Sequence, residues 1–149
     1  MKYIHYGHNE FDIKKFDKIE NDSLCITKPK GGLWASRVDA NFGWKDFCLK
    51  EKYSMDFEDY FTFELKENAR ILEIRTIKDL EGLPRALDNK PYFDKKEFII
   101  KLDFEKLSKE YDAIEVFIDE INELYFKLYG WDCESILIMN SNVIKIIND

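Results

Sequence analysis

Short segments with a strand-like pattern of apolar residues recur along the whole chain. Residues 59–65 (DYFTFEL) alternate apolar and polar side chains, and residues 2–6 (KYIHY) do so more weakly before Gly7 ends the segment. Residues 135–139 (SILIM) form a continuous apolar run, as expected for a strand that is buried on both faces. Five more short strands are predicted, at residues 23–27 (SLCIT), 33–36 (LWAS), 69–76 (ARILEIRT), 113–117 (AIEVF) and 143–147 (VIKII).

Helical spacing of apolar residues is confined to fewer segments. In the first of these, Trp44 shares a face with the apolar residues three and four positions later. Thr76 and Asp103 each precede a helical pattern and are predicted N-caps, and Gly130 is a predicted C-terminal stop. The four predicted helices span residues 42–52, 76–83, 103–111 and 118–130.

The connecting segments are rich in turn-forming residues. Residues 28–32 (KPKGG) are typical of a turn, because proline fixes φ and two glycines tolerate positive φ. Residues 68–69 and 140–142 also suit turns, and the first of these is compatible with a hairpin. Residues 84–96 predict a surface loop, whereas residues 10–19 fit either a short helix or an ordered loop.

Many short strands with a few helices between them predict an α+β fold. The chain has 149 residues, so we expect one domain spanning residues 1–149. Apolar residues make up 45% of the chain and aromatic residues 15%, enough for a core that needs no disulfide or metal. No internal repeat or low-complexity segment interrupts this pattern.

Charge and cysteine usage limit the possible partners and the compartment. A net charge of −7 argues against broad nucleic-acid binding, although it leaves room for a small basic pocket that holds a phosphorylated ligand. Cys25, Cys48 and Cys133 are scattered and odd in number, which indicates reduced thiols in a cytoplasmic protein. His5 and His8 are expected on opposite faces of an extended segment, so no metal site is predicted. No apolar stretch is long enough to span a bilayer, so no membrane span is predicted either.

Two acids immediately before the run at residues 135–139 are candidates for chemistry. Asp132 and Glu134 are two residues apart, and on a strand such residues face the same side. Two close carboxylates suit the stabilisation of a cationic transition state or the positioning of a sugar hydroxyl. The alternative is a solvated turn at the entrance to a strand.

The first strand and its end supply a second group of candidates. His5 can hydrogen-bond a ligand that approaches the backbone near Tyr6 and Gly7. The alternative is a half-buried histidine with a local partner.

The segment KPKGGLWAS supplies a third group. Gly31 and Gly32 allow a close backbone approach or simply a tight turn, and Trp34 is either a stacking platform or a core residue. Ser36 can bind a ribose hydroxyl or cap the segment that follows it. Trp44 and Trp131 sit at the apolar edges of elements and are expected in the core.

The order of these groups resembles the ADP-ribosyltransferase superfamily. Its members carry a histidine or arginine on the first strand, an aromatic residue with Ser or Thr on a central strand, and a glutamate on a later strand. The ending also resembles family members, with YDAI at residues 111–114, ESILIMN at 134–140 and VIK at 143–145. The middle, residues 50–100, matches no motif. The combination also resembles a narrower bacterial or phage family.

This sequence departs from the family pattern at three positions. Ala113 replaces the usual glycine, Trp34 stands where tyrosine or phenylalanine is more ordinary, and Asp132 stands where many members have Glu or Gln. The last change bears on the choice of acceptor, because the residue at this position often orients the nucleophile.

The resemblance implies two small, mostly antiparallel sheets that form a cleft for NAD. His5 would hydrogen-bond the nicotinamide-side ribose, the Gly7 backbone would lie against the carboxamide, and Trp34 would line or stack on the ring. Ser36 would hold Glu134 or the ribose, and Glu134 would stabilise oxocarbenium charge as the glycosidic bond breaks. The resemblance also implies a basic group at the pyrophosphate, for which Lys28, Lys30 and Arg37 are candidates.

The resemblance implies an NAD-dependent mono-ADP-ribosyltransferase or an NAD-cleaving relative, acting on an unknown protein or small-molecule acceptor. The alternative is a non-catalytic protein on the same fold that binds a partner protein, such as a phage- or immunity-type inhibitor. An acidic chain rich in aromatic residues would suit that role.

Overall fold

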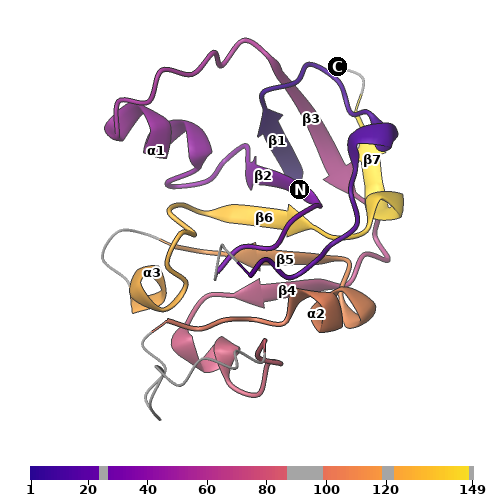
Figure 1. Ribbon diagram of the computed structural model, residues 1–149. Coiled ribbons are helices and arrows are strands. Elements are labelled where there is room, and N and C mark those ends of the chain that lie inside the picture. The colour runs from indigo at the N-terminus through magenta and orange to yellow at the C-terminus, as the bar shows by residue number, and fades with distance from the viewer. Residues whose placement is uncertain (24–26, 87–98, 119–122, 148–149) are drawn as a thin grey trace.

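The structure, a computed structural model, describes residues 1–23, 27–86, 99–118 and 123–147. It is a mixed α+β protein built on one seven-stranded sheet, in the order β4-β5-β6-β2-β1-β3-β7 (Figure 1). Only β4 and β5 are parallel, and every other neighbouring pair is antiparallel. The strands are β1 (Lys2–Tyr6), β2 (Leu33–Arg37), β3 (Tyr60–Leu65), β4 (Ile71–Ile74), β5 (Ala113–Val116), β6 (Ser135–Ile138) and β7 (Ile144–Ile146).

The three predicted helices that lie wholly within the described residues are present and shorter than expected, and the fourth is described only from Glu123. Asp103 caps α2 by accepting a hydrogen bond from the Lys106 amide, which confirms its predicted role. Thr76 is the N-cap of a helix with 3-10 rather than α geometry, and residues 10–19 contain only a single 3-10 turn. The helices are η1 (Ile13–Lys15), α1 (Trp44–Lys50), η2 (Ile77–Leu80), α2 (Phe104–Glu110), α3 (Glu123–Lys127) and η3 (Ser141–Val143).

The strand pairing corrects two expectations. The strands form one continuous sheet where two small sheets were expected, because β1 and β2 pair and join the two groups of strands. A hairpin around residues 68–69 is wrong, since β3 pairs with β1 and β7 while β4 pairs with β5. Of the predicted elements, most of residues 23–27, 84–96 and the start of 118–130 lies outside the described residues.

The junction between β1 and β2 is the narrowest in the sheet. Its register joins only Tyr3 to Arg37 and Ile4 to Ser36, whereas β1 pairs with β3 along its whole length. Figure 1 shows β1 and β3 running steeply across the view while β4, β5 and β6 run almost horizontally. The sheet therefore twists strongly at this junction.

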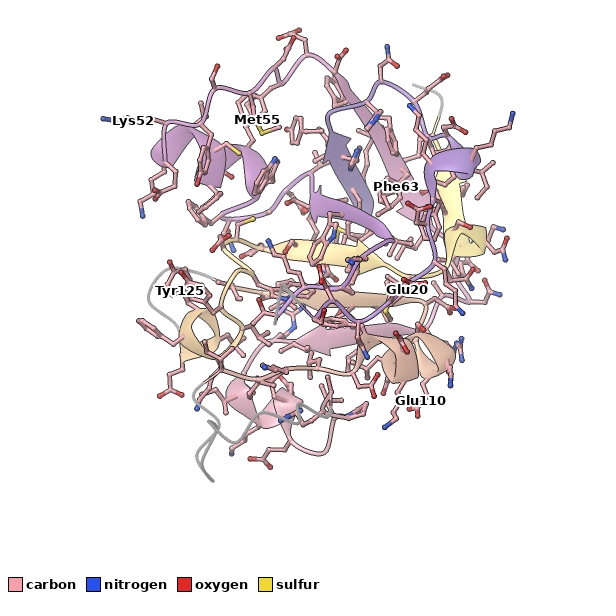
Figure 2. The ribbon with its side chains drawn as sticks, viewed as in Figure 1. Glu20, Lys52, Met55, Phe63, Glu110 and Tyr125 are labelled. Carbon is pink, nitrogen blue, oxygen red and sulfur yellow. The ribbon has the colours of Figure 1, made fainter. Side chains whose placement is uncertain are left out.

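Both faces of the central strands are buried, which explains their uninterrupted apolar sequences. On one face, Ile114 and Leu137 pack with the helices around β4 to β6. On the other, Ile136 and Ile138 pack with Phe63 of β3, which is labelled in Figure 2. Two apolar clusters thus lie on opposite sides of one sheet.

Gly31 and Gly32 have a structural explanation. Both have positive φ, and a Cβ at Gly31 would lie 2.2 Å from the carbonyl oxygen of Lys18. A Cβ at Gly32 would lie 2.7 Å from the carbonyl oxygen of Ile138. The two glycines therefore allow the backbones of Lys18 and Ile138 to approach closely. These contacts explain both glycines without a ligand.

A buried ion pair connects β2 to β5. The guanidinium of Arg37 donates two hydrogen bonds to the Glu115 carboxylate, at 2.6 and 2.7 Å, and Glu115 is only 3% exposed. The Tyr3 hydroxyl lies 3.5 Å from the same carboxylate, and burial raises the pKa of Tyr3. This pair anchors three strands from both sides of the narrow junction.

Arg37→Met should lower the free energy of unfolding by about 3–5 kcal/mol, because it leaves the Glu115 carboxylate buried and unpaired. Adding Glu115→Met should restore about half of that loss, since two apolar side chains replace the pair. Urea unfolding of both variants measures this. A loss below about 1 kcal/mol for Arg37→Met would contradict the anchoring role.

Asp112 links the start of β5 to the ends of two other segments. Its carboxylate accepts hydrogen bonds from the backbone and guanidinium of Arg70 and, at 2.9 Å, from the side-chain amide of Asn140. The Arg70 hydrogen bond, with help from Asn140, lowers the pKa of Asp112 to about 2. Asp112 and Asn140 belong to two of the three C-terminal segments on which the resemblance to ADP-ribosyltransferases rests, and here they stabilise the fold.

Because the pKa of Asp112 is depressed in the folded state, its contribution is complete above pH 4 or so and is lost as the pH falls through about 2. Asp112→Asn should lower the free energy of unfolding by about 2 kcal/mol at pH 7. The difference from wild type should shrink between pH 4 and pH 2. Urea titrations at several pH values test this, and a difference that stays constant with pH would argue against the assignment.

Candidate functional site

A cleft opens where β1 and β2 separate. Their shared register ends at Ile4 and Ser36, and beyond it the two strands diverge. The resulting cavity has a volume of about 330 Å³. Its wall comes from segments that are far apart in the sequence: Ile4, His5, Tyr6, Lys28, Trp34, Ala35, Ser36, Trp44, Met55, Trp131, Asp132, Cys133 and Ser135.

The cleft continues beside α1. Met55, labelled in Figure 2, and Trp44 lie on the α1 side of its wall. A second cavity of about 320 Å³ shares Ile4, Tyr6, Ser36 and Trp44 with the first and extends toward residues 37–46. The two adjoining cavities have the size range of small-molecule sites, which begins at about 300 Å³.

His5 bridges the two diverging strands. Its Nδ1 lies 2.7 Å from the carbonyl oxygen of Trp34, and because a carbonyl only accepts, Nδ1 carries the proton. Burial lowers the pKa of His5, so the neutral ring is favoured and its Nε2 is an acceptor. His5 can therefore accept a hydrogen bond from a ligand hydroxyl rather than donate one.

The expectation that His5 and His8 face opposite sides is wrong. Their rings stack with centroids 5.6 Å apart, and Nε2 of His5 lies 3.4 Å from Nδ1 of His8. The strand ends at Tyr6, and Gly7, with φ of 106°, turns the chain so that His8 returns to His5. The alternation rule stops applying once the strand has ended.

Tyr6 and Gly7 lie differently with respect to the cleft. Tyr6 lines both adjoining cavities and packs edge-on against Phe57. Gly7 is outside the lining, where its amide donates to the carbonyl of Asp59 and a Cβ would meet nothing within 4 Å. Of the two, only Tyr6 reaches the cavity.

Three tryptophans form much of the wall. Trp34 and Trp131 pack edge to face with centroids 4.7 Å apart, and the Trp131 indole donates to the carbonyl of Thr27. Trp131 is almost fully buried, as expected for a core residue, yet it also lines the cavity with half-buried Trp44. Apolar residues in a cleft wall follow the same sequence pattern as core residues, so sequence alone assigned both to the core.

Ser36 organises the segment around the acids. Its hydroxyl donates to the carbonyl of Glu134 at 2.9 Å and accepts from the Trp44 amide at 3.0 Å. Ser36 therefore fixes the backbone of Glu134 and the start of α1 at once. Ser36, with both of these hydrogen bonds made, is only 2% exposed.

Asp132 and Glu134 do not point the same way. Strand β6 begins only at Ser135, so both acids precede it and the two-residue alternation does not apply. Asp132 lines the cavity and makes no hydrogen bond or ion pair within the described residues. The Glu134 carboxylate instead accepts a hydrogen bond from the backbone amide of Asn41, at 3.3 Å, and Glu134 is not part of the cavity wall.

The three basic candidates differ in their position relative to the two cavities. Lys28 lines the cavity, and its ammonium group lies 5.3 Å from the centroid of the Trp34 ring. Arg37 lines the adjoining cavity, but its guanidinium is bound to Glu115. Lys30 is exposed, outside both linings, and 3.8 Å from the carboxylate of Asp22.

Cys133 contributes a thiol to the cavity wall. Burial raises the pKa of the Cys133 thiol to about 12, so it stays protonated at neutral pH. Cys48 and Cys133 are free thiols, whereas Cys25 lies outside the described residues. Within the described ranges, no group of three or more His, Cys, Asp or Glu residues has the arrangement of a metal site.

No family model, curated protein or solved structure matches the chain. The resemblance to ADP-ribosyltransferases therefore has no support from a related protein and stays a hypothesis. In the part of the chain that the structure describes, none of the helices combines the length and apolar character of a membrane span.

The His5 tautomer can be measured directly. Two-bond ¹H–¹⁵N correlation spectra of the imidazole ring at pH 7 should show a proton on Nδ1 of His5 and none on Nε2. The pKa of His5 should lie below its ordinary value of 6.5. Since the folded-state pKa is lowered, the stability from neutral His5 is complete above pH 6.5 and falls as the pH drops below it. An imidazolium at pH 6.5 or a proton on Nε2 would overturn this geometry.

Proposed function

We propose that the cleft binds NAD by its nicotinamide end and that the protein transfers ADP-ribose to an acceptor or to water. The carrying observation is that one cavity gathers His5, Tyr6 and Trp34 with Ser36 and Asp132. These residues come from the segments whose order resembles ADP-ribosyltransferases. Their convergence supports the proposal, because the resemblance assigns these residues to one ligand.

The cavity wall is suited to one half of such a ligand. Trp34 and Trp44 offer flat apolar surfaces for a nicotinamide ring. His5 Nε2 would accept a hydrogen bond from a ribose hydroxyl in place of its 3.4 Å contact with His8 Nδ1, since its other nitrogen is held by the Trp34 carbonyl. The adjoining cavity offers room for the remainder of the dinucleotide.

NAD would supply a glycosidic bond whose cleavage releases nicotinamide with the bonding electrons. The protein's task is to stabilise the positive charge that then develops on the ribose, for which a carboxylate is required. The acceptor or a water molecule forms the new bond at the same carbon and gives up its proton. In an apolar wall a carboxylate acts more strongly than it would in water.

We assign bond cleavage to Glu134 and orientation of the acceptor to Asp132. The Glu134 backbone is held on both sides, by Ser36 at its carbonyl and by the Phe42 carbonyl at its amide. Within the described residues its carboxylate accepts one hydrogen bond, at 3.3 Å from the backbone amide of Asn41, and the proposed role requires the side chain to turn from there toward the cavity. Asp132 already faces the cavity, which makes it the natural rival for the same role.

Glu134→Gln should reduce nicotinamide release from NAD by about a hundredfold or more, because it removes the charge that stabilises the transition state. NAD binding should weaken only modestly. Asp132→Asn, the matched control, should reduce transfer to an acceptor more than it reduces hydrolysis. Nicotinamide release measures total cleavage of NAD, free ADP-ribose measures the part lost to hydrolysis, and circular dichroism verifies folding.

Two outcomes would decide against these assignments. If Asp132→Asn abolishes hydrolysis and Glu134→Gln does not, the roles of the two acids are exchanged. If the wild type neither binds NAD in a thermal-shift assay nor cleaves it, the enzymatic proposal fails.

Exposed aromatic residues favour a second candidate, a non-catalytic protein that binds a partner protein. Phe126 of α3 is 56% exposed and Tyr129, just after α3, is 62% exposed. Aromatic side chains of this kind are enriched at protein interfaces. This candidate predicts no thermal shift with NAD, so the same assay separates it from the enzyme.

A further inference from the structure

Lys28 is the one lysine or arginine among the described residues that line the main cavity. Its backbone is anchored by its neighbour, because Thr27 receives a hydrogen bond from the Trp131 indole and donates its hydroxyl to the Tyr129 carbonyl. From this anchor the Lys28 side chain reaches over Trp34, with Nζ 5.3 Å from the ring centroid. The chain thus places its own cation on an aromatic face inside the cleft.

The surroundings explain why a cation is stable there. An ammonium group over an indole face is attracted by the negative face of the ring, and tryptophan is the strongest such partner. Asp132 lines the same cavity and makes no hydrogen bond or ion pair within the described residues. The cavity therefore offers an aromatic face and a carboxylate, which is the chemistry that holds an organic cation.

We infer that Lys28 is an internal competitor for a positively charged ring. It occupies the face of Trp34 in the free protein and is displaced when a pyridinium ring binds there. For the natural ligand this rests on the proposed function, since the nicotinamide ring of NAD is a cation and that of NADH is neutral. Lys28 then sets the preference of the cleft between charged and neutral rings.

The same charge affects the reaction. A displaced Lys28 stays close to the ring and raises the energy of the charged ring by repulsion. Cleavage of the glycosidic bond returns the bonding electrons to the ring nitrogen, so the ring becomes neutral and that repulsion ends. Removing Lys28 should therefore tighten substrate binding and slow cleavage, which lowers KM and kcat together.

The test compares Lys28→Met, which keeps most of the length of the side chain and removes its charge, with Lys28→Arg, which keeps the charge. Lys30→Met is the matched control, because Lys30 is two residues away and outside the cavity lining. The probes are 1-methylnicotinamide, a charged ring without phosphate, neutral nicotinamide, and ADP-ribose. Tryptophan fluorescence or calorimetry measures binding, and urea unfolding verifies that each variant is folded.

Lys28→Met should bind 1-methylnicotinamide about five- to tenfold more tightly than wild type, and nicotinamide within about twofold. Lys28→Arg and Lys30→Met should behave as wild type. Equal or weaker binding of the charged ring by Lys28→Met overturns the inference, as does an equal gain for both rings or no ring binding by any variant. Weaker binding of ADP-ribose by Lys28→Met would make Lys28 a phosphate ligand, which also overturns it.

The two proposals can fail separately. If Lys28→Met gains affinity for 1-methylnicotinamide while no variant cleaves NAD, the cation site is real and the proposed enzymatic function is wrong. If NAD is cleaved and Lys28→Met shows no gain, the enzyme stands and the competitor does not.

Discussion

The guanidinium of Arg37 and the carboxylate of Glu115 meet on one face of the sheet, across the strand that separates β2 from β5. Tyr3, in register with Arg37 on β1, adds its hydroxyl to the same group. Since β1 and β2 share so short a register, these side chains hold together two parts of the sheet that backbone pairing alone joins weakly. The position of the cleft depends on them, because the next pair along, Ile4 and Ser36, forms its inner end.

The cleft lies at the junction where two neighbouring strands share the shortest register. Where two strands diverge, backbone groups become available and space opens without a break in the core. His5 satisfies the Trp34 carbonyl there, and Ser36 satisfies the Glu134 carbonyl. Backbone groups near the opening are thus satisfied by side chains of the cleft wall.

Local sequence patterns predicted most elements of the fold. The alternation in β3, the apolar run in β6 and the cap at Asp103 each depend on residues close together in the chain. Strand order does not, which is why the expected hairpin between β3 and β4 and the two separate sheets were wrong. Pairing is decided by contacts between distant segments, and no short pattern encodes them.

Some residues of the candidate site were predictable from local sequence and others were not. His5, Trp34 and Ser36 stand in recognisable segments, and the structure brings them into one cavity. The directions of Asp132 and Glu134 were not predictable, because they depend on where β6 begins. The order of strands also bears on how the protein is made. The partner of Ser36 of β2, Glu134, lies 98 residues later in the chain, and that length takes roughly 5–20 s to synthesise. Strand β2 therefore leaves the ribosome before β6 exists to pair with it, and its open edge needs protection during that time.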